Sequence, residues 1–249
     1  LVVGGKNQAA TNDITIALAS TMSATTIQNL FNTYPHNLNG YSLNVTLSSG
    51  LYDLSGPLDL NGFFNAAVIN IYGTTIVSGA STVQVAMLLS TNVHPSYGHC
   101  NLLYLDGLQS RGGIVVSSLA FSNKTAGLTA GGAAETRMLS ISDCSAVTVQ
   151  SCYFFGDSTN LGAAVRASGA GPVEACFDTF NTVNIGVAAT GLGRVGLTSN
   201  TWVTAKPYYH PSVERGGQAS LYNSTENDVG TTNRISAGGL FVDSAGGRL

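Results

Sequence analysis

Charged residues are scarce in this sequence. Asp, Glu, Lys and Arg together make up only 9% of the 249 residues, against roughly 25% in ordinary globular proteins. The formal net charge is −3 and no stripe of basic residues is present, so nucleic acid is not an expected partner. No apolar run reaches the ~20 residues of a membrane-spanning helix, so membrane insertion is not expected. The apolar content of 44% excludes a disordered chain.

Motifs that bind metals or cofactors are missing too. The four cysteines form no C-x2-C pair, so a zinc site is not expected. Cys144 and Cys152 can form a disulfide or serve as small buried apolar residues, and both alternatives stay open. His94 and His99 flank a short loop without a neighbouring acid, which favours ordinary loop histidines. No nucleophile elbow or phosphate-binding glycine loop occurs, so we predict neither a metal nor a cofactor.

One side-chain pattern recurs four times. Each copy has two apolar residues at alternate positions, then a variable residue three positions later, then an aromatic residue two positions after that. The copies span residues 114–121, 147–154, 173–180 and 195–202. Alternation predicts β-strands, and the longer step predicts a bend. We therefore expect the aromatic residues of the four copies to stack inside as one column. They are Phe121, Phe154, Phe180 and Trp202.

A second apolar column precedes the first. It lies eight and six residues before the start of each copy, as in Leu139 and Ile141, and the same spacing places Asp106 and Leu108 there in the first copy. Two short strands cannot bury an apolar face alone, whereas stacked coils can. The sequence therefore predicts an all-β fold, a single-stranded parallel β-helix. An ordinary β-sandwich is the alternative.

A helix is expected near the N-terminus. Residues 1–22 are small and polar and are expected to form an extended arm. Ser23 or Thr25 can cap a helix that ends at Pro35. Its apolar residues fall on one face at helical spacing: Ile27, Leu30, Phe31 and Tyr34. We expect this helix to cap the open end of the coil, where strand edges would otherwise invite aggregation.

The segment after the helix carries a family resemblance. It reads SLNVTLSSGLYDLSGPLDLNGFF and then VINIYG, with a G-x-Y turn, a short strand, a Gly-Phe turn and a strand that ends in Gly. This order resembles the opening of pectate-lyase-like right-handed β-helix proteins of bacteriophage and prophage tails. The resemblance covers about residues 23–205. It implies a right-handed coil in a tail spike, tail fibre or similar host-surface module, often trimeric. It does not imply one activity, because this fold hosts lyases, hydrolases and inert shafts.

The chain is accordingly divided into three parts. Residues 1–22 form the N-terminal arm, and residues 23–205 form the parallel β-helix with its N-terminal capping helix. Residues 206–249 begin with an aromatic loop at 206–211 and continue as a tail, which forms either a last coil or a trimer contact.

Candidate catalytic residues are those whose alternation points them outward. Arg166, Glu174 and Arg194 meet this condition and form a conceivable site for acid–base or lyase chemistry. The alternative is that they are solvated charges with local ion pairs. Asp178 lies beside the core, so we expect it to accept backbone N–H bonds at a bend. The acidic clusters that bind calcium in pectate lyases have no match.

The outward positions of the repeat are small and nearly uncharged. They are Val115, Ser117, Ala120, Thr148, Gln150, Tyr153, Glu174, Cys176, Thr179, Gly196, Thr198 and Thr201. Such a surface suits contact with another copy, which favours a homotrimer. It also suits a groove for cell-surface polysaccharide. There Tyr153, Tyr208 and Tyr209 would meet sugar rings, and Asp157 is a further candidate for substrate binding.

Three functions follow. The first is a phage or prophage tail spike or fibre module that binds cell-surface polysaccharide or serves as a structural shaft. The second is a polysaccharide-degrading enzyme, a glycoside hydrolase or polyuronate lyase, on the same coil. The third is a bacterial surface adhesin. The expected location is the virion tail, or the extracellular space or cell surface.

Overall fold

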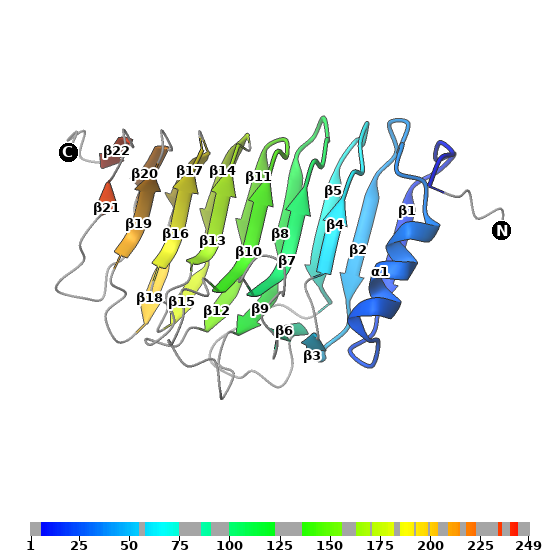
Figure 1. Ribbon diagram of the computed structural model, residues 1–249, viewed down its shortest axis with the longest axis horizontal. Helices are drawn as coiled ribbons and strands as arrows, with labels where there is room; N and C mark the ends of the chain where they lie inside the picture. Colours follow the sequence, from blue (N-terminus) through cyan, green and yellow to red (C-terminus); the bar gives the residue numbers. More distant parts are fainter. Residues whose placement is uncertain are drawn as a thin grey trace.

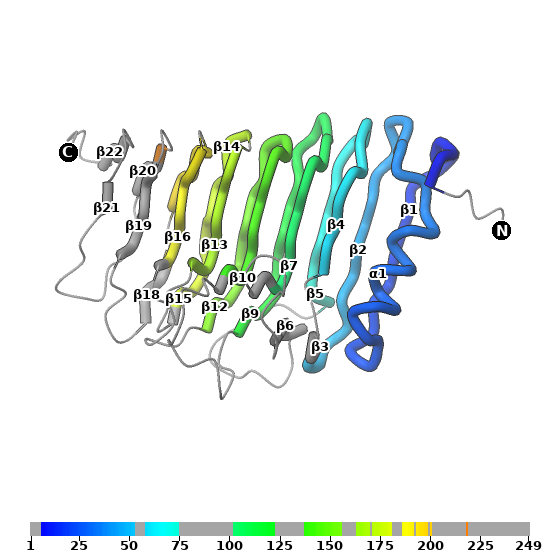
Figure 2. Tube along the Cα trace, viewed as in Figure 1, coloured from blue at the N-terminus to red at the C-terminus, as the bar shows by residue number. Residues whose placement is uncertain are grey.

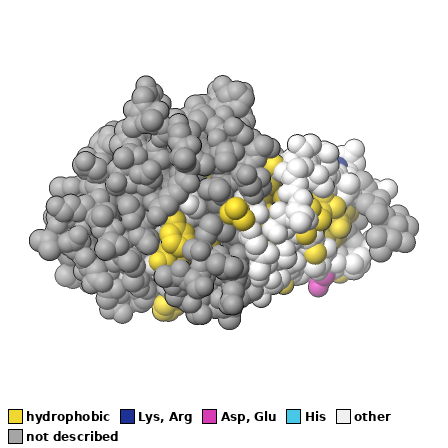
Figure 3. All heavy atoms as spheres, turned by 90° about the horizontal axis from the view of Figure 1, so that it is seen from below, with side chains coloured by type: hydrophobic (Ala, Val, Ile, Leu, Met, Phe, Trp, Pro, Cys, Tyr) yellow, Lys and Arg dark blue, Asp and Glu magenta, His cyan; other side chains and the backbone are white. Residues whose placement is uncertain are grey.

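The computed structural model describes the chain in fourteen stretches. They are residues 6–54, 58–74, 86–90, 100–122, 136–155, 163–169, 171–181, 185–191, 193–198, 200–203, 209–214, 218–222, 234–235 and 240–243. The strands lie side by side in one long stack, with the two ends of the chain at opposite ends (Figures 1 and 2). Uncharged side chains dominate the described part of the face in Figure 3, as the composition predicts. No helix in the described stretches is long and apolar enough to cross a membrane.

Three parallel sheets make up the stack, which we name I, II and III. Sheet I contains β1 (Ile14–Leu18), β2 (Leu43–Leu47), β5 (Ile69–Gly73), β8 (Ile114–Ser117), β11 (Val147–Gln150), β14 (Pro172–Cys176), β17 (Arg194–Thr198), β20 (Gln218–Tyr222) and β22 (Leu240–Asp243). Sheet II contains β3 (Gly50–Leu54), β6 (Ala86–Ser90), β9 (Leu119–Ser122), β12 (Tyr153–Phe155), β15 (Thr179–Asn181) and β18 (Thr201–Val203). Sheet III contains β4 (Leu58–Asn61), β7 (Cys100–Asp106), β10 (Thr136–Ser142), β13 (Ala163–Ser168), β16 (Ile185–Thr190), β19 (Tyr209–Glu214) and β21 (Arg234–Ile235).

The chain visits the sheets in a constant order. From β2 to β19 it passes through sheets I, II and III in turn, and we call one such passage a round. Within each sheet, a strand pairs with the equivalent strands of the neighbouring rounds. The chain is therefore an all-β protein of parallel sheets with one helix in its described part, an arrangement compatible with a parallel β-helix. Sheets I and III continue past residue 205 through β19, β20, β21 and β22. Tyr209 to Pro211, expected in a loop, begin β19 instead.

The predicted repeat agrees with the strand register. The starting residues Ile114, Val147, Val173 and Val195 face one another in sheet I. The aromatic residues of the four copies are likewise register partners in sheet II. The repeat therefore marks equivalent positions of successive rounds.

The aromatic column is confirmed for three of its members. Phe121 and Phe154 stack with ring centroids 5.0 Å apart, and Phe154 and Phe180 with centroids 5.1 Å apart. All three side chains are buried. Trp202 continues the register from Phe180, but its side chain lies outside the described residues. In the first round Tyr52 stands at this position, two rounds before Phe121.

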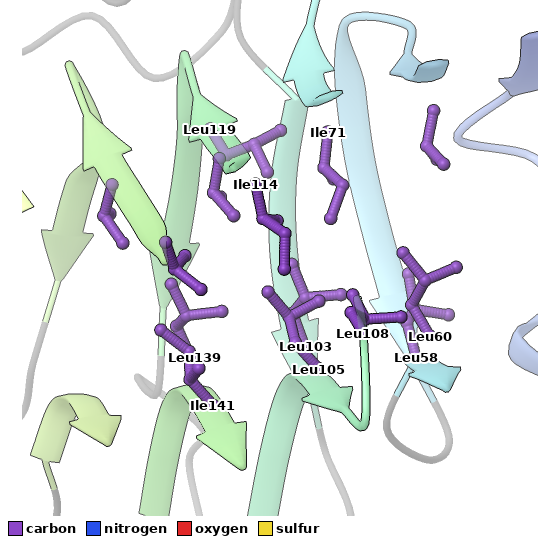
Figure 4. Packing of buried hydrophobic residues seen from close by; sticks show 14 of the residues in the cluster. Leu58, Leu60, Ile71, Leu103, Leu105, Leu108, Ile114, Leu119, Leu139 and Ile141 are labelled. Atoms are coloured by element: carbon purple, nitrogen blue, oxygen red, sulfur yellow. The ribbon is translucent and has the colours of Figure 1, made fainter. Parts of the chain in front are cut away.

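The second predicted column was wrong in its first copy. Leu103 and Leu105, rather than Asp106 and Leu108, face Leu139 and Ile141. The reason is that the bend at 107–113 is longer than the bend at 143–146, so a fixed spacing misplaces β7. Leu108 is nevertheless buried, beside Leu103 and Leu105 (Figure 4).

The predicted helix is present as α1 (Ala24–Thr33). The Ser23 hydroxyl accepts a hydrogen bond from the Thr26 N–H at 3.1 Å, which caps the first turn. Ala24, Ile27 and Phe31 are buried, and Leu30 and Tyr34 pack against the core. The expected apolar face is therefore confirmed.

The helix also supplies hydrogen bonds to the edge strand of sheet III. The Gln28 side-chain amide donates to the Asp59 carbonyl at 3.0 Å, and its carbonyl accepts from the Asp59 N–H at 3.2 Å. One amide side chain thus pairs with the outer edge of β4 as a neighbouring strand would. This contact explains how a helix can close the end of a sheet.

The segment expected to be an extended arm contains a strand. β1 pairs with β2 in parallel register, and Ile14, Ile16 and Leu18 are buried while Thr15 and Ala17 are exposed. This strand was missed because it is short and precedes the resembling segment. Cys144 and Cys152 are buried free thiols, so the alternative of a disulfide between them is wrong.

Candidate functional site on the outer face of sheet III

The three predicted catalytic residues do not converge. Arg166 lies in β13 of sheet III, whereas Glu174 in β14 and Arg194 in β17 belong to sheet I. Arg166 points outward as expected, because its neighbours Val165 and Ala167 are fully buried. The expected constellation of two arginines and a glutamate is therefore divided between two sheets.

Glu174 makes a local contact instead. Its carboxylate accepts a short hydrogen bond from the Thr198 hydroxyl of the next round. To reach it, the side chain crosses Gly196, where an added Cβ would collide with the Glu174 carboxylate. Arg194 is exposed at the start of β17, opposite Pro172. The described residues contain no ion pair between Arg194 and Glu174. These two residues therefore fit the alternative interpretation, in which they are solvated charges and not a catalytic site.

The expected sugar-binding tyrosines are not assembled either. Tyr153 takes the outward position predicted for it, but it is only 6% exposed, so little of its ring can meet a sugar. It stacks on Phe155 with centroids 4.2 Å apart and packs against Ala120, another outward residue that is buried. These residues form a second apolar cluster, apart from the main core. Tyr208 and Asp157 lie outside the described residues, as does the side chain of Tyr209.

Asp178 has the structural role expected of it. Its carboxylate accepts a hydrogen bond from the Cys152 N–H at 2.7 Å, and its own N–H donates to the Asn200 side chain at 2.8 Å. Asn200 in turn donates to the Ala175 carbonyl at 2.8 Å. Burial raises the pKa of Asp178 well above its ordinary value, against the effect of the backbone N–H groups that bond to its carboxylate. Its second oxygen is buried without a hydrogen-bond partner among the described residues.

Mostly polar residues occupy the outward positions of sheet III, although Ser140, Ala188 and Thr190 among them are buried. One row of register partners runs across β4, β7, β10, β13 and β16: Asp59, Tyr104, Ser140, Arg166 and Ala188. The parallel row two residues further along is Asn61, Asp106, Ser142, Ser168 and Thr190. The Arg166 guanidinium donates to the Thr190 hydroxyl at 3.4 Å, which joins the rows. Hydroxyls, amides, acids and one guanidinium thus lie within a few strands of each other.

Acidic groups gather at the N-terminal part of this face. Partial burial and the nearby Asp143 carboxylate raise the pKa of Asp106. Burial also raises the pKa of Tyr104, opposed by a hydrogen bond to Ser142 and assisted by the charges of Asp106, Asp59 and Asp143. Asp106 is the register partner of Ser142, so Asp143, the next residue, lies one position further along on the neighbouring round.

Asp143 occupies an unusual backbone position. The bend after each described sheet III strand from β4 to β16 contains a residue with positive φ, and the others are glycines: Gly62, Gly107, Gly169 and Gly191. Asp143 adopts a φ of 50° there, which costs roughly 1–2 kcal/mol for a residue with a Cβ. Its carboxylate lies over Gly169, where an added Cβ would come within 2.6 Å of Oδ1. Local strain of this kind is common at functional positions.

This arrangement of hydroxyls, amides and acids suits hydrogen bonding to a polyhydroxylated ligand. No group of three or more His, Cys, Asp or Glu side chains in the described stretches can hold a metal ion. The sequence reasoning missed Asp59, Tyr104 and Asp106 as members of one site. The signal that could have found them was the alternation within residues 100–106. The fixed repeat spacing assigned this strand the wrong register, because it placed Asp106 where Leu103 lies.

Comparisons with known proteins add no relative. No family model, no curated protein and no solved structure matches this chain.

Proposed function

We propose that this chain is a right-handed single-stranded parallel β-helix of the pectate-lyase-like type found in bacteriophage or prophage tails. In this proposal it is a tail spike or fibre module that binds cell-surface polysaccharide. The support for the coil is the constant passage of the chain through three parallel sheets. The support for the family is the resemblance over about residues 23–205, whose quoted motifs lie in residues 42–73.

One observation carries the proposed binding function: the two in-register polar rows on the outer face of sheet III. Neighbouring strands lie about 4.8 Å apart, so polar side chains recur along the stack at a spacing comparable to a sugar ring. Tyr104 offers a half-buried ring beside hydroxyls and carboxylates. A polysaccharide lying along the stack would meet such groups from β4 to β13, where Asn61, Tyr104, Ser142 and Ser168 are at least partly exposed.

A binding measurement tests this proposal. The full chain is titrated calorimetrically with fragments of purified bacterial capsular and outer-membrane polysaccharides. We expect at least one fragment to bind and Tyr104→Ala to weaken it about tenfold, equivalent to about 1.4 kcal/mol. The matched control is Tyr72→Ala, which removes a half-buried tyrosine from sheet I. Equal losses in both variants, or no binding to any fragment, would contradict the proposal.

The proposal includes a homotrimer. The outward side chains of sheet I are small and mostly uncharged, including Asn44, Asn70, Ser117 and Thr148. Such a face packs closely against a symmetry-related copy without burying unpaired charge. Light scattering should give three times the chain mass at micromolar concentration, and a monomer mass would contradict the trimer.

Two acids on neighbouring rounds, Asp106 and Asp143, favour a second candidate, a glycoside hydrolase on the same face. A carboxyl whose pKa is raised can donate a proton to a leaving oxygen while a second carboxylate assists the opposite face of the sugar. Asp106 would be the acid, since burial and Asp143 both raise its pKa. New reducing ends from a bound polysaccharide, abolished by Asp106→Asn but not by Asp13→Asn, would establish this activity. Binding without cleavage would exclude it for that polysaccharide.

A further inference from the structure

The bends that lead from sheet III to sheet I differ along the stack. Residues 62–68 and 107–113 make wide bends, and residues 36–42 lie beside them as the chain enters β2. The later bends, at 143–146, 169–171 and 191–193, are much shorter. The three long segments form a surface that we name the N-terminal ridge. Long loops on a regular scaffold often carry binding residues.

The N-terminal ridge is held by backbone hydrogen bonds between rounds. Leu38 N–H donates to the Phe64 carbonyl at 2.9 Å, and Gly40 N–H donates to the Asn65 carbonyl at 2.7 Å. On the other side, Arg111 N–H donates to the Ala66 carbonyl at 3.0 Å. Beneath this layer the buried His36 ring stacks on Phe63 with centroids 4.3 Å apart. The ridge is therefore ordered before any ligand arrives, which lowers the entropic cost of binding.

The exposed side chains of the ridge combine aromatic rings with amides and one cation. Phe64 is 45% exposed and Tyr41 is 36% exposed. Asn65 follows Phe64 in the chain, and its carbonyl accepts from the N–H of Gly40, the residue before Tyr41. Its side-chain oxygen accepts from the Arg111 guanidinium at 3.4 Å. Single exposed apolar residues are ordinary, but two exposed rings on the same ridge as an amide and a guanidinium provide the groups that meet sugar faces and sugar carboxylates.

Arg111 indicates the charge of the ligand. Its side chain is exposed, and within the described stretches its only hydrogen-bonded partner is the neutral Asn65 amide. No carboxylate of the described residues forms an ion pair with it. An arginine held in this way is available for a planar carboxylate.

We propose that the N-terminal ridge is a second glycan subsite, which takes an oligosaccharide bearing carboxylates. Sugar rings lie on Phe64 and Tyr41, and a carboxylate binds Arg111 beside Asn65. This inference rests on the proposed polysaccharide-binding function and places a separate contact at the corner next to sheet III. The two surfaces adjoin, because Gln109 of the ridge donates to the Asp143 carbonyl at 3.0 Å.

The test uses the full chain and three probes: hexamers of galacturonate, hexamers of sialic acid, and carboxyl-reduced galacturonate hexamers as the uncharged match. We expect one acidic hexamer to bind, and its affinity to fall at least tenfold in Phe64→Ser and in Arg111→Gln. Arg111→Lys keeps the charge and should lose less. The control is Phe177→Ser, which removes a 66% exposed ring from the bend between sheets I and II and should change nothing.

The outcomes separate this inference from the proposed function. Unchanged affinity in Phe64→Ser and Arg111→Gln, with a loss in Tyr104→Ala, would overturn the ridge and leave the sheet III site standing. Equal binding of the reduced hexamer would overturn the role of Arg111 in selecting charge. Binding of polysaccharide fragments but of neither acidic hexamer would also overturn the ridge, while the absence of all glycan binding would overturn both proposals. Circular dichroism of each variant shows whether it is folded.

Discussion

The N-terminal rounds and the later rounds of this stack are held together differently. From β8 to β17 the same positions recur: apolar residues in sheet I, stacked phenylalanines in sheet II and short bends between sheets III and I. The first rounds keep the apolar column of sheet I, through Leu43 and Ile69, and add individual polar contacts. Gln28 pairs with the edge of β4, and the Tyr52 hydroxyl donates to the Leu18 carbonyl at 2.9 Å.

This difference reflects the place of each round in the stack. An inner round has a neighbour on both sides, so repetition supplies every backbone and apolar partner. A terminal round has a neighbour on one side only, and side chains must pair with the exposed edge. Repetition therefore governs the middle, and individual contacts govern the end. The wide bends of the N-terminal ridge occur where repetition is weakest.

The largest effect should come from breaking the repeated column. Phe154→Ala removes a buried ring that stacks on both Phe121 and Phe180. We expect a loss of about 3–5 kcal/mol in the free energy of unfolding, from lost apolar burial and the cavity. Urea denaturation measures it, with Phe177→Ala as the exposed control. A loss below about 1 kcal/mol would mean that the Phe154 ring is not closely packed between its neighbours.

The next effect compares a tight bend with a wide one. A Cβ at Gly193 would lie 2.5 Å from the Ala167 carbonyl oxygen and 3.0 Å from that of Thr190. Both atoms belong to the backbone, so Gly193→Ala should cost about 2–3 kcal/mol. Gly40 of the ridge has a φ of +85° but nothing within 4 Å of its added Cβ, and Gly40→Ala should cost about 1 kcal/mol. Thermal unfolding of both variants shows which one loses more stability. Equal losses would contradict the expectation that the bend at Gly193 is more tightly packed than the ridge at Gly40.

A smaller effect should come from a terminal contact. Tyr52→Phe keeps the ring in its buried position and removes the hydroxyl that bonds to Leu18 and Ser48. We expect a loss of about 1 kcal/mol, the net value of such a hydrogen bond. Tyr72→Phe on the outer face of sheet I serves as the control and should be neutral. If both changes are neutral in urea denaturation, the terminal round does not depend on this contact.

The last prediction is a gain that depends on pH. Burial holds the pKa of Asp178 well above 3.8, so the folded chain keeps a proton that the unfolded chain releases above about pH 4. Stability is therefore lost as the pH rises from this value toward the folded pKa. Asp178→Asn removes this loss, and Asn200 one round later shows that an amide here can both accept and donate. The melting temperature of the variant should exceed that of the parent chain at pH 7, with the difference vanishing below pH 4. A constant difference across this range would contradict the role of the proton.

The sequence predicted the repeated part of the fold well. The columns of Phe121, Phe154 and Phe180 and the helix capped by Ser23 follow from local periodicity, which does not depend on distant parts of the chain. Tyr153 was misjudged, because alternation assigns a side to each residue but does not say what packs against the outer side. Asp106 was misplaced because bend length changes between rounds, and register is a property of two strands rather than of one.

The sequence by itself determined which residues face inward, since strand alternation and apolar burial act over a few neighbouring residues. The tertiary structure decided which outward residues meet. It separated Arg166 from Glu174 and Arg194 by placing them on different sheets, and it placed Asp106 opposite Ser142, the residue before Asp143, on the neighbouring round. The physical reason is that parallel pairing fixes contacts between residues far apart in the chain, and bend lengths set that pairing.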